Sequence, residues 1–141
     1  MLFNGGTQID IREYSPLALA FAGDGVLELL VRGRAVREHR LSPGRLHALC
    51  VKYVSAKGQA LGLAAVEPLL TEREKDVVRR GKNASKATVA KHATAEEYRA
   101  STGFEALLGY LYLTGENQRI EELFDAFWQR VTACLEAEKQ G

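Results

Sequence analysis

The segment YRASTGFEALLGYLYL, residues 98–113, decides the fold class of this chain. It follows Thr94-Ala95-Glu96-Glu97, a capping box in which a threonine hydroxyl and a glutamate side chain satisfy backbone N–H groups at a helix start. Apolar residues surround this helix on nearly every side, which predicts a central position among other helices. Gly115 is expected to end it. A carboxylate, Glu105, interrupts the apolar stretch.

Helical signals continue in both directions from this segment, while strand-like alternation is almost absent. Ser15-Pro16 and Ser42-Pro43 each combine an N-cap with proline at the first helical position. The helix after Ser42 is expected to kink or divide near Ser55 to Gly58. A second capping box, Thr71 to Glu74, opens a helix that should run to about Arg80. The last helix, residues 116–139, is amphipathic, and its apolar stripe comprises Ile120, Leu123, Phe124, Phe127, Val131 and Leu135.

The composition is that of an ordinary globular protein, with 141 residues, 46% hydrophobic and 26% charged. These features predict an all-α fold and a single domain spanning residues 1–141. No apolar run approaches the ~20 residues that cross a membrane, and the N-terminus lacks a signal-peptide layout. We therefore expect a cytoplasmic protein. The net charge is only +1, so any anion-binding function must come from local clusters of basic residues.

A second carboxylate, Asp24, also lies in an apolar stretch. Burying a lone carboxylate is costly, so both acids need partners. Asp24 would be satisfied as a helix N-cap after Gly23, and Glu105 would be satisfied by a buried ion pair with an arginine. Alternatively, both bind Mg²⁺, which takes hard oxygen ligands and keeps several waters. Such an ion activates water and stabilises charge on a phosphate. The residue pattern leaves these alternatives open.

Glu28 follows Asp24 by one helical turn and lies on the same side of the helix. It is either an outer contact of that ion or a solvated, salt-bridged residue.

Residues 77–95 form a basic segment without an acidic residue. Residues 81–93 are predicted to be a loop of roughly 12 residues, long enough to suggest a function. Phosphate contact is one interpretation, with Asn83, Ser85 and Thr88 as neutral donors; a solvated charge run is the other. Lys57 and Gln59 extend the polar surface. The basic residues of the segment are Arg79, Arg80, Lys82, Lys86, Lys91 and His92.

Two segments resemble the endonuclease domain of the ribonuclease III family. FAGDGVLEL, residues 21–29, is similar to its signature helix, usually E-x-L-G-D-A-x-L, and FEALLGYLYL, residues 104–113, is similar to its second acidic helix. Full-length enzymes have a glutamate at the position of Ala20 and an aspartate at that of Thr102. These departures, with VSAKGQA and RRGKNASK, resemble the Mini-ribonuclease III subfamily, which has only the catalytic domain and no double-stranded RNA-binding domain.

The resemblance implies an all-helical homodimer of the ribonuclease III endonuclease fold that binds double-stranded RNA. It implies Mg²⁺-dependent hydrolysis, with Mn²⁺ able to substitute, and maturation of the 23S ribosomal RNA precursor. Asp24 and Glu105 match the catalytic, metal-binding acids. The changes at Ala20 and Thr102 leave open whether each site binds one metal ion or two. The RNA-binding residues are expected to be Arg79, Arg80, Lys82, Asn83, Ser85, Lys86, Lys57 and Gln59. A non-catalytic duplex-binding module and a helical protein-interaction domain are the competing hypotheses.

Overall fold

The computed structural model describes residues 10, 13–86 and 93–140. This part of the chain forms α1 (Pro16–Glu38), α2 (Pro43–Val54), α3 (Ala56–Val66), the short 3₁₀ helix η2 (Glu67–Leu69), α4 (Glu72–Ala84), α5 (Ala95–Leu113) and α6 (Asn117–Gln140). It contains no strand, so the all-α prediction is confirmed. No helix in the described residues is both long enough and apolar enough to cross a membrane.

The predicted helix starts are confirmed by their caps. Ser15 Oγ accepts the N–H of Ala18 at 3.0 Å, and both capping boxes are complete. Ser55 closes α2 and caps α3, so the predicted kink is a break between two helices. The end of α4 differs from the prediction, because the helix continues past Arg80 to Ala84.

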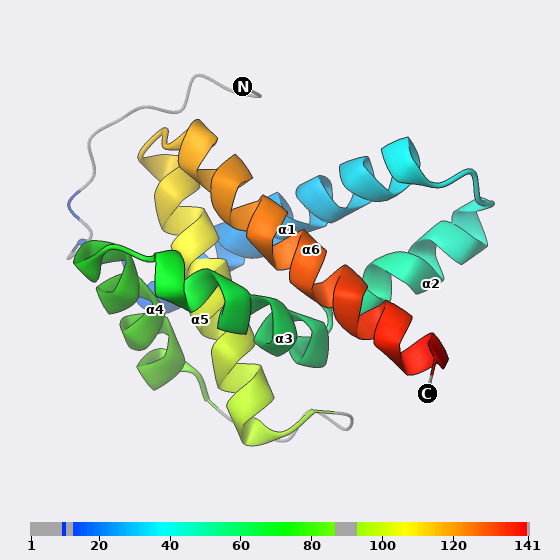
Figure 1. The fold of residues 1–141 in the computed structure, drawn as a ribbon. Coiled ribbons are helices and arrows are strands. Elements are labelled where there is room, and N and C mark those ends of the chain that lie inside the picture. Colours follow the sequence, from blue (N-terminus) through cyan, green and yellow to red (C-terminus); the bar gives the residue numbers. More distant parts are fainter. Residues whose placement is uncertain (1–9, 11–12, 87–92, 141) are drawn as a thin grey trace.

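Helix α5 is the centre of the fold, as its apolar sequence predicted. It packs against α1, α3 and α4, and Figure 1 shows it (yellow) running through the middle of the molecule. Phe104, Leu107 and Leu108 are completely buried. Helix α6 crosses this assembly and packs mainly on α3. The predicted stripe of α6 is buried up to Val131, and it also includes Trp128, which stacks on Tyr53 with ring centroids 4.0 Å apart.

Two glycines allow α1 and α5 to touch through their backbones. A Cβ atom at Gly23 would lie 1.7 Å from the main-chain oxygen of Glu105, and a Cβ at Gly109 would lie 1.9 Å from that of Leu19. No side chain fits in either place. This contact brings Asp24, the neighbour of Gly23, beside Glu105.

The end of α4 packs on α5 through a similar pair. A Cβ atom at Gly81 would lie 2.9 Å from Gly103 Cα, and one at Gly103 would lie 2.8 Å from the main-chain oxygen of Val78. Packing on α5 therefore extends α4 through residues of low helix propensity. The last turn of α4 consequently lies beside the helix that carries Glu105.

Candidate functional site

Asp24 and Glu105 form a pair of carboxylates between α1 and α5. Asp24 lies well inside α1, which runs without interruption from Pro16 to Glu38, so the N-cap alternative for Asp24 is wrong. Asp24 is exposed and Glu105 is half-buried, so the expectation that both are enclosed by apolar residues is only partly correct. The pair lies at the surface, with Glu105 set more deeply.

The partner of the Glu105 carboxylate is an amide. Gln59 Nε2 donates to Glu105 Oε2 at 3.0 Å and to the main-chain oxygen of Val54 at 2.9 Å. Within the described residues no arginine pairs with Glu105, so the ion-pair alternative is also not observed. Burial raises the pKa of Glu105 to about 7, the Gln59 hydrogen bond opposes that rise, and the charge of Asp24 and a hydrogen bond with it add to it.

Glu28 is a salt-bridged residue at the edge of this pair. Its Oε2 accepts from Arg32 Nε at 3.2 Å, which agrees with the second of the two interpretations of this residue. Its charge contributes a further, smaller rise to the pKa of Glu105. Glu28 is therefore close enough to influence the site electrostatically while its carboxylate is held by an arginine.

Ala20 and Thr102, which differ from the full-length enzymes, are both buried. The Thr102 hydroxyl donates to the main-chain oxygen of Tyr98 at 3.1 Å, and its oxygen lies within hydrogen-bond distance of the Ser85 hydroxyl, 3.2 Å from Oγ. Thr102 thus connects α5 to the residue that caps the end of α4, and it adds no charge to the site.

The donor set suits a small, hard cation. Within the residues that the structure describes, no group of three or more His, Cys, Asp or Glu side chains is arranged to hold a metal ion. Asp24 and Glu105 nevertheless supply carboxylate oxygens side by side, and Asp24 makes ionisation of Glu105 less favourable. A divalent cation would relieve this repulsion. Mg²⁺ often takes only one or two protein carboxylates and completes its shell with water, so these residues fit it.

Helix α4 extends into the segment predicted to be a loop, so Lys82 and Asn83 lie on a helix. Arg79, Arg80, Lys82 and Asn83 belong to the last turns of α4, and Ser85 caps its end. Arg79 pairs with Asp76, and Lys82 Nζ lies 3.6 Å from Glu67 Oε2. Lys86 follows the cap and is exposed, while Thr88, Lys91 and His92 lie outside the described residues. Within the described residues, positive charge is therefore presented mainly by the end of α4, beside α5.

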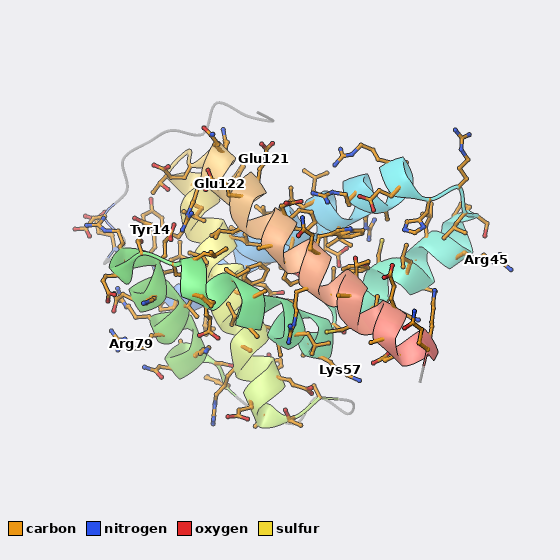
Figure 2. All side chains as sticks on the ribbon, viewed as in Figure 1. Tyr14, Arg45, Lys57, Arg79, Glu121 and Glu122 are labelled. Atoms are coloured by element: carbon orange, nitrogen blue, oxygen red, sulfur yellow. The ribbon has the colours of Figure 1, made fainter. Side chains whose placement is uncertain are left out.

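Lys57 and Gln59 have different environments, although both were expected to extend the RNA-binding surface. Figure 2 shows Lys57 projecting outward at the start of α3, where its Nζ lies 3.8 Å from Glu138 Oε1. Gln59 is only 2% exposed and its amide bonds to Glu105, so the structure does not support direct RNA contact by this side chain. The Ser55 cap and Gly58 turn α3 so that Gln59 points inward, which no periodicity in the sequence indicates.

Comparison with known proteins identifies the family of this chain. Residues 17–116 match the family model described as the Ribonuclease III domain. The Mini-ribonuclease 3 of Symbiobacterium thermophilum is 47% identical over 111 residues, covering 79% of this chain and 85% of that protein. The Mini-ribonuclease 3 of Thermoanaerobacter sp. is 44% identical over 119 residues, covering 84% of each.

A solved structure shares the fold of this chain. A crystal structure of a Fusobacterium nucleatum protein superposes with a TM-score of 0.72 at 26% identity, covering 93% of this chain and 99% of the other. The domain match, the sequence identities and the fold agree with one another. The chain therefore belongs to the ribonuclease III family of endoribonucleases, in its Mini-ribonuclease 3 group.

Proposed function

We propose that this protein hydrolyses phosphodiester bonds of double-stranded RNA, and that Asp24 and Glu105 hold the Mg²⁺ ion required for the reaction. The observation that carries the proposal is the placement of the two carboxylates side by side by the α1–α5 contact. When bound, the ion would supply charge stabilisation at the phosphate and activation of water. Mn²⁺, which also accepts carboxylate ligands, is expected to substitute.

The protein's own residues bind and orient the substrate. The last turns of α4 carry Arg79, Arg80 and Lys82, and α4 packs on the helix that contains Glu105. These cations suit the phosphates of an RNA duplex, whose wide minor groove and backbone are recognised mainly by shape and charge. Asn83 and the Ser85 hydroxyl are neutral donors at the same end of α4. The cellular substrate that we propose, from the resemblance to Mini-ribonuclease III, is the 23S ribosomal RNA precursor.

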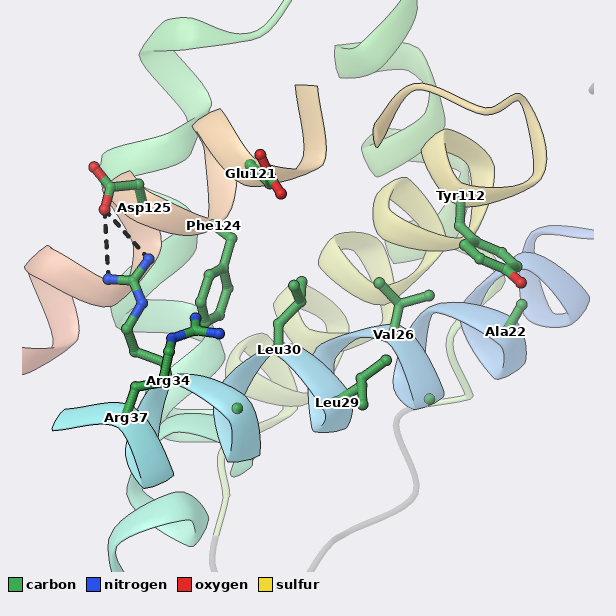
Figure 3. A pocket seen from close by; sticks show the side chains of 12 residues that line it. Ala22, Val26, Leu29, Leu30, Arg34, Arg37, Tyr112, Glu121, Phe124 and Asp125 are labelled. Atoms are coloured by element: carbon green, nitrogen blue, oxygen red, sulfur yellow. Dashed lines mark hydrogen bonds and ion pairs between the residues drawn. The ribbon is translucent and has the colours of Figure 1, made fainter. Parts of the chain in front are cut away.

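A homodimer is also part of the proposal, supported by an apolar groove and an exposed phenylalanine on α1. The groove has a volume of about 760 Å³, and Figure 3 shows it bordered by α1, Tyr112 of α5 and Phe124 of α6, with Arg34 bonded to Asp125 at one end. Phe21 is 86% exposed, an unusual position for a large aromatic residue. We propose that Phe21 of a second copy occupies the groove, and the reverse, as two-fold symmetry requires.

The experiment is cleavage of a long RNA duplex in Mg²⁺ by Asp24→Asn and Glu105→Gln. Both variants should remain folded and lose activity by at least about 100-fold, because the ion loses a charged ligand. Glu72→Gln removes an exposed carboxylate at the other end of α4 and should keep full activity. Full activity of folded Asp24→Asn would overturn the proposal. Duplex binding by the unmodified protein, without cleavage at any Mg²⁺ or Mn²⁺ concentration, would instead favour a non-catalytic RNA-binding module.

A further inference from the structure

Gln59 is a buried polar side chain whose burial is not explained by packing. It is 2% exposed on α3, and its Oε1 is enclosed without a hydrogen-bond partner among the described residues. A buried, unsatisfied carbonyl oxygen destabilises a protein, whereas an apolar side chain of similar volume would fill the same space without that cost. The amide must therefore gain its advantage from what its nitrogen contacts.

Both hydrogens of the Gln59 amide are directed to acceptors. Nε2 lies 2.9 Å from the main-chain oxygen of Val54, the last residue of α2, and 3.0 Å from Glu105 Oε2. Because the Val54 carbonyl oxygen can only accept, the nitrogen rather than the oxygen of the amide must be on this side. The bond to Val54 fixes the amide to the backbone, so the amide cannot swing away from Glu105.

The turn between α2 and α3 brings Gln59 to this place. A Cβ atom at Gly58 would lie 2.2 Å from the main-chain oxygen of Lys52, so the two helices meet closely only with glycine there. Gln59 follows directly, and α3 packs against α5. One rigid corner of the backbone therefore holds the donor that engages Glu105.

The chemistry of this donor is suited to a cation site. An amide N–H bonds Oε2 of the Glu105 carboxylate and leaves the other oxygen, Oε1, without a bond to the amide. Being neutral, it leaves both negative charges of the pair in place, whereas a lysine or arginine would cancel one of them and compete with a cation. Within the described residues no third carboxylate joins the pair to hold an ion, so orientation of the two that are present has a larger effect on binding.

We propose that Gln59 is a positioning residue for the cation site, holding the Glu105 carboxylate by its Oε2 so that the remaining oxygen and Asp24 bind the ion together. This inference rests on the proposed function of the two acids. Gln59 then belongs to the interior of the site and not to the RNA-contacting surface. Gln59 itself touches neither the ion nor the RNA.

The test compares Gln59→Met with Leu63→Met. Methionine fills the volume of the glutamine without its donors, and Leu63 is a buried residue one turn further along α3 that makes the matched change in packing. Mn²⁺ affinity is measured by electron paramagnetic resonance without RNA, and folding is checked by circular dichroism. We expect Gln59→Met to bind Mn²⁺ at least fivefold more weakly and to need correspondingly more Mg²⁺ for half-maximal cleavage. Its KM for duplex RNA at saturating Mg²⁺ should be unchanged, and Leu63→Met should match the unmodified protein.

The outcomes separate the two claims. If Asp24→Asn loses Mn²⁺ binding while folded Gln59→Met binds within twofold of the unmodified protein, the positioning role is overturned and the proposed function stands. If Asp24→Asn and Glu105→Gln both bind Mn²⁺ as the unmodified protein does, the proposed function and the positioning role fail together. Should Gln59→Met not fold, Gln59→Asn keeps an amide too short to span Val54 and Glu105, and normal Mn²⁺ affinity in that variant would overturn the positioning role.

Discussion

Gly23 of α1 rests on the main-chain carbonyl of Glu105 in α5, so closely that a Cβ atom at position 23 would lie 1.7 Å from that oxygen. Asp24 is the next residue along α1, and it acts on the Glu105 carboxyl through its charge. The neighbourhood of the two acids is therefore set by contact between backbones.

Gly23→Ala should be strongly destabilising. Alanine normally favours a helix over glycine by about 1 kcal/mol, but here the new methyl group overlaps a backbone atom that cannot move without separating α1 from α5. We expect a loss of about 3 kcal/mol or more in the free energy of unfolding, measured by urea denaturation. The control is Gly44→Ala in α2, where nothing lies within 4 Å of the new Cβ. Equal stability of the two variants would contradict the close contact.

Stability of the metal-free protein should depend on the ionisation of Glu105. Burial raises the pKa of Glu105 from its ordinary value of 4.5 to about 7, with Gln59 opposing and Asp24 adding to the rise. Between these values the folded protein keeps a proton that the unfolded chain has lost, so stability falls as the pH rises. Relative to Glu105→Gln, we expect the free energy of unfolding to fall by roughly 2 kcal/mol from about pH 5 to pH 8 in EDTA. Parallel pH profiles of the two proteins would refute this.

Arg119 should stabilise the junction between α4 and α6. Its Nε and Nη2 donate to the two oxygens of buried Glu74 at 2.9 and 2.8 Å, and Nη2 also donates to the Leu69 carbonyl oxygen at 2.7 Å. Arg119→Met leaves the Glu74 carboxylate buried without its cation, and we expect a loss of about 2–3 kcal/mol in urea denaturation. Lys75→Met breaks an exposed pair on α4 and should change stability by less than about 0.5 kcal/mol.

The stability that the Arg119–Glu74 ion pair provides should also depend on pH in the acid range. Burial would raise the pKa of Glu74, but hydrogen bonds from Arg119 and Thr71 outweigh it and hold the pKa below its ordinary value of 4.5. The stabilisation is therefore present above pH 4.5 and is lost as the pH falls through the pKa of the folded state. The difference between Arg119→Met and the unmodified protein should shrink in acid. A difference that is constant with pH would show that the ion pair is not its source.

The basic end of α4 should determine the salt dependence of RNA binding. Replacing Arg80, Lys82 and Lys86 with glutamine in an Asp24→Asn background should weaken duplex binding. The plot of log K against log salt should become shallower by about 2–3 units, as expected for loss of up to three phosphate contacts. Fluorescence anisotropy measures both quantities. The charge-matched control replaces Arg45, Arg130 and Lys139, which are exposed on other helices; an equal loss in both variants would mean that α4 has no special role.

Phe21 should control self-association. Phe21→Asp removes the exposed ring and adds a charge that cannot enter an apolar groove, so we expect the dimer dissociation constant to rise by at least about 100-fold. Sedimentation velocity over a concentration series measures it. Val36→Asp is the control, since Val36 is 62% exposed on the same helix but does not line the groove. A dimer that survives Phe21→Asp unchanged would place the interface elsewhere.

The helix starts were predictable because they depend on local chemistry. Ser15, Ser42, Thr71 and Thr94 each cap a helix where the sequence places an N-cap signal. The end of α4 was not, because Gly81 continues the helix only through its contact with Gly103 on another element. A loop was the reasonable prediction from a segment of glycine, asparagine and serine.

In the candidate site, too, the features that depend on neighbouring residues in the sequence were predictable, and those that depend on tertiary packing were not. Asp24 and Glu105 were identifiable as carboxylates in apolar surroundings and through the resemblance of their flanking residues to a known family. The exposure of Asp24 was not predictable, because it depends on how α1 is rotated against α5. The sequence predicts a surface position for Gln59, because nothing near it indicates that its partner is 46 residues away.

The crossing of α1 and α5 has a consequence for attempts to redesign the protein. Helices separated by side chains can slide or tilt when those side chains change, and the groups they carry drift with them. Here there is no layer of side chains to thin or thicken at Gly23 and Gly109. The distance between the backbones that carry the two acids is therefore fixed. A variant meant to accept a larger ion would have to change the length of the side chains at positions 24, 59 and 105, because the distance between α1 and α5 cannot be adjusted.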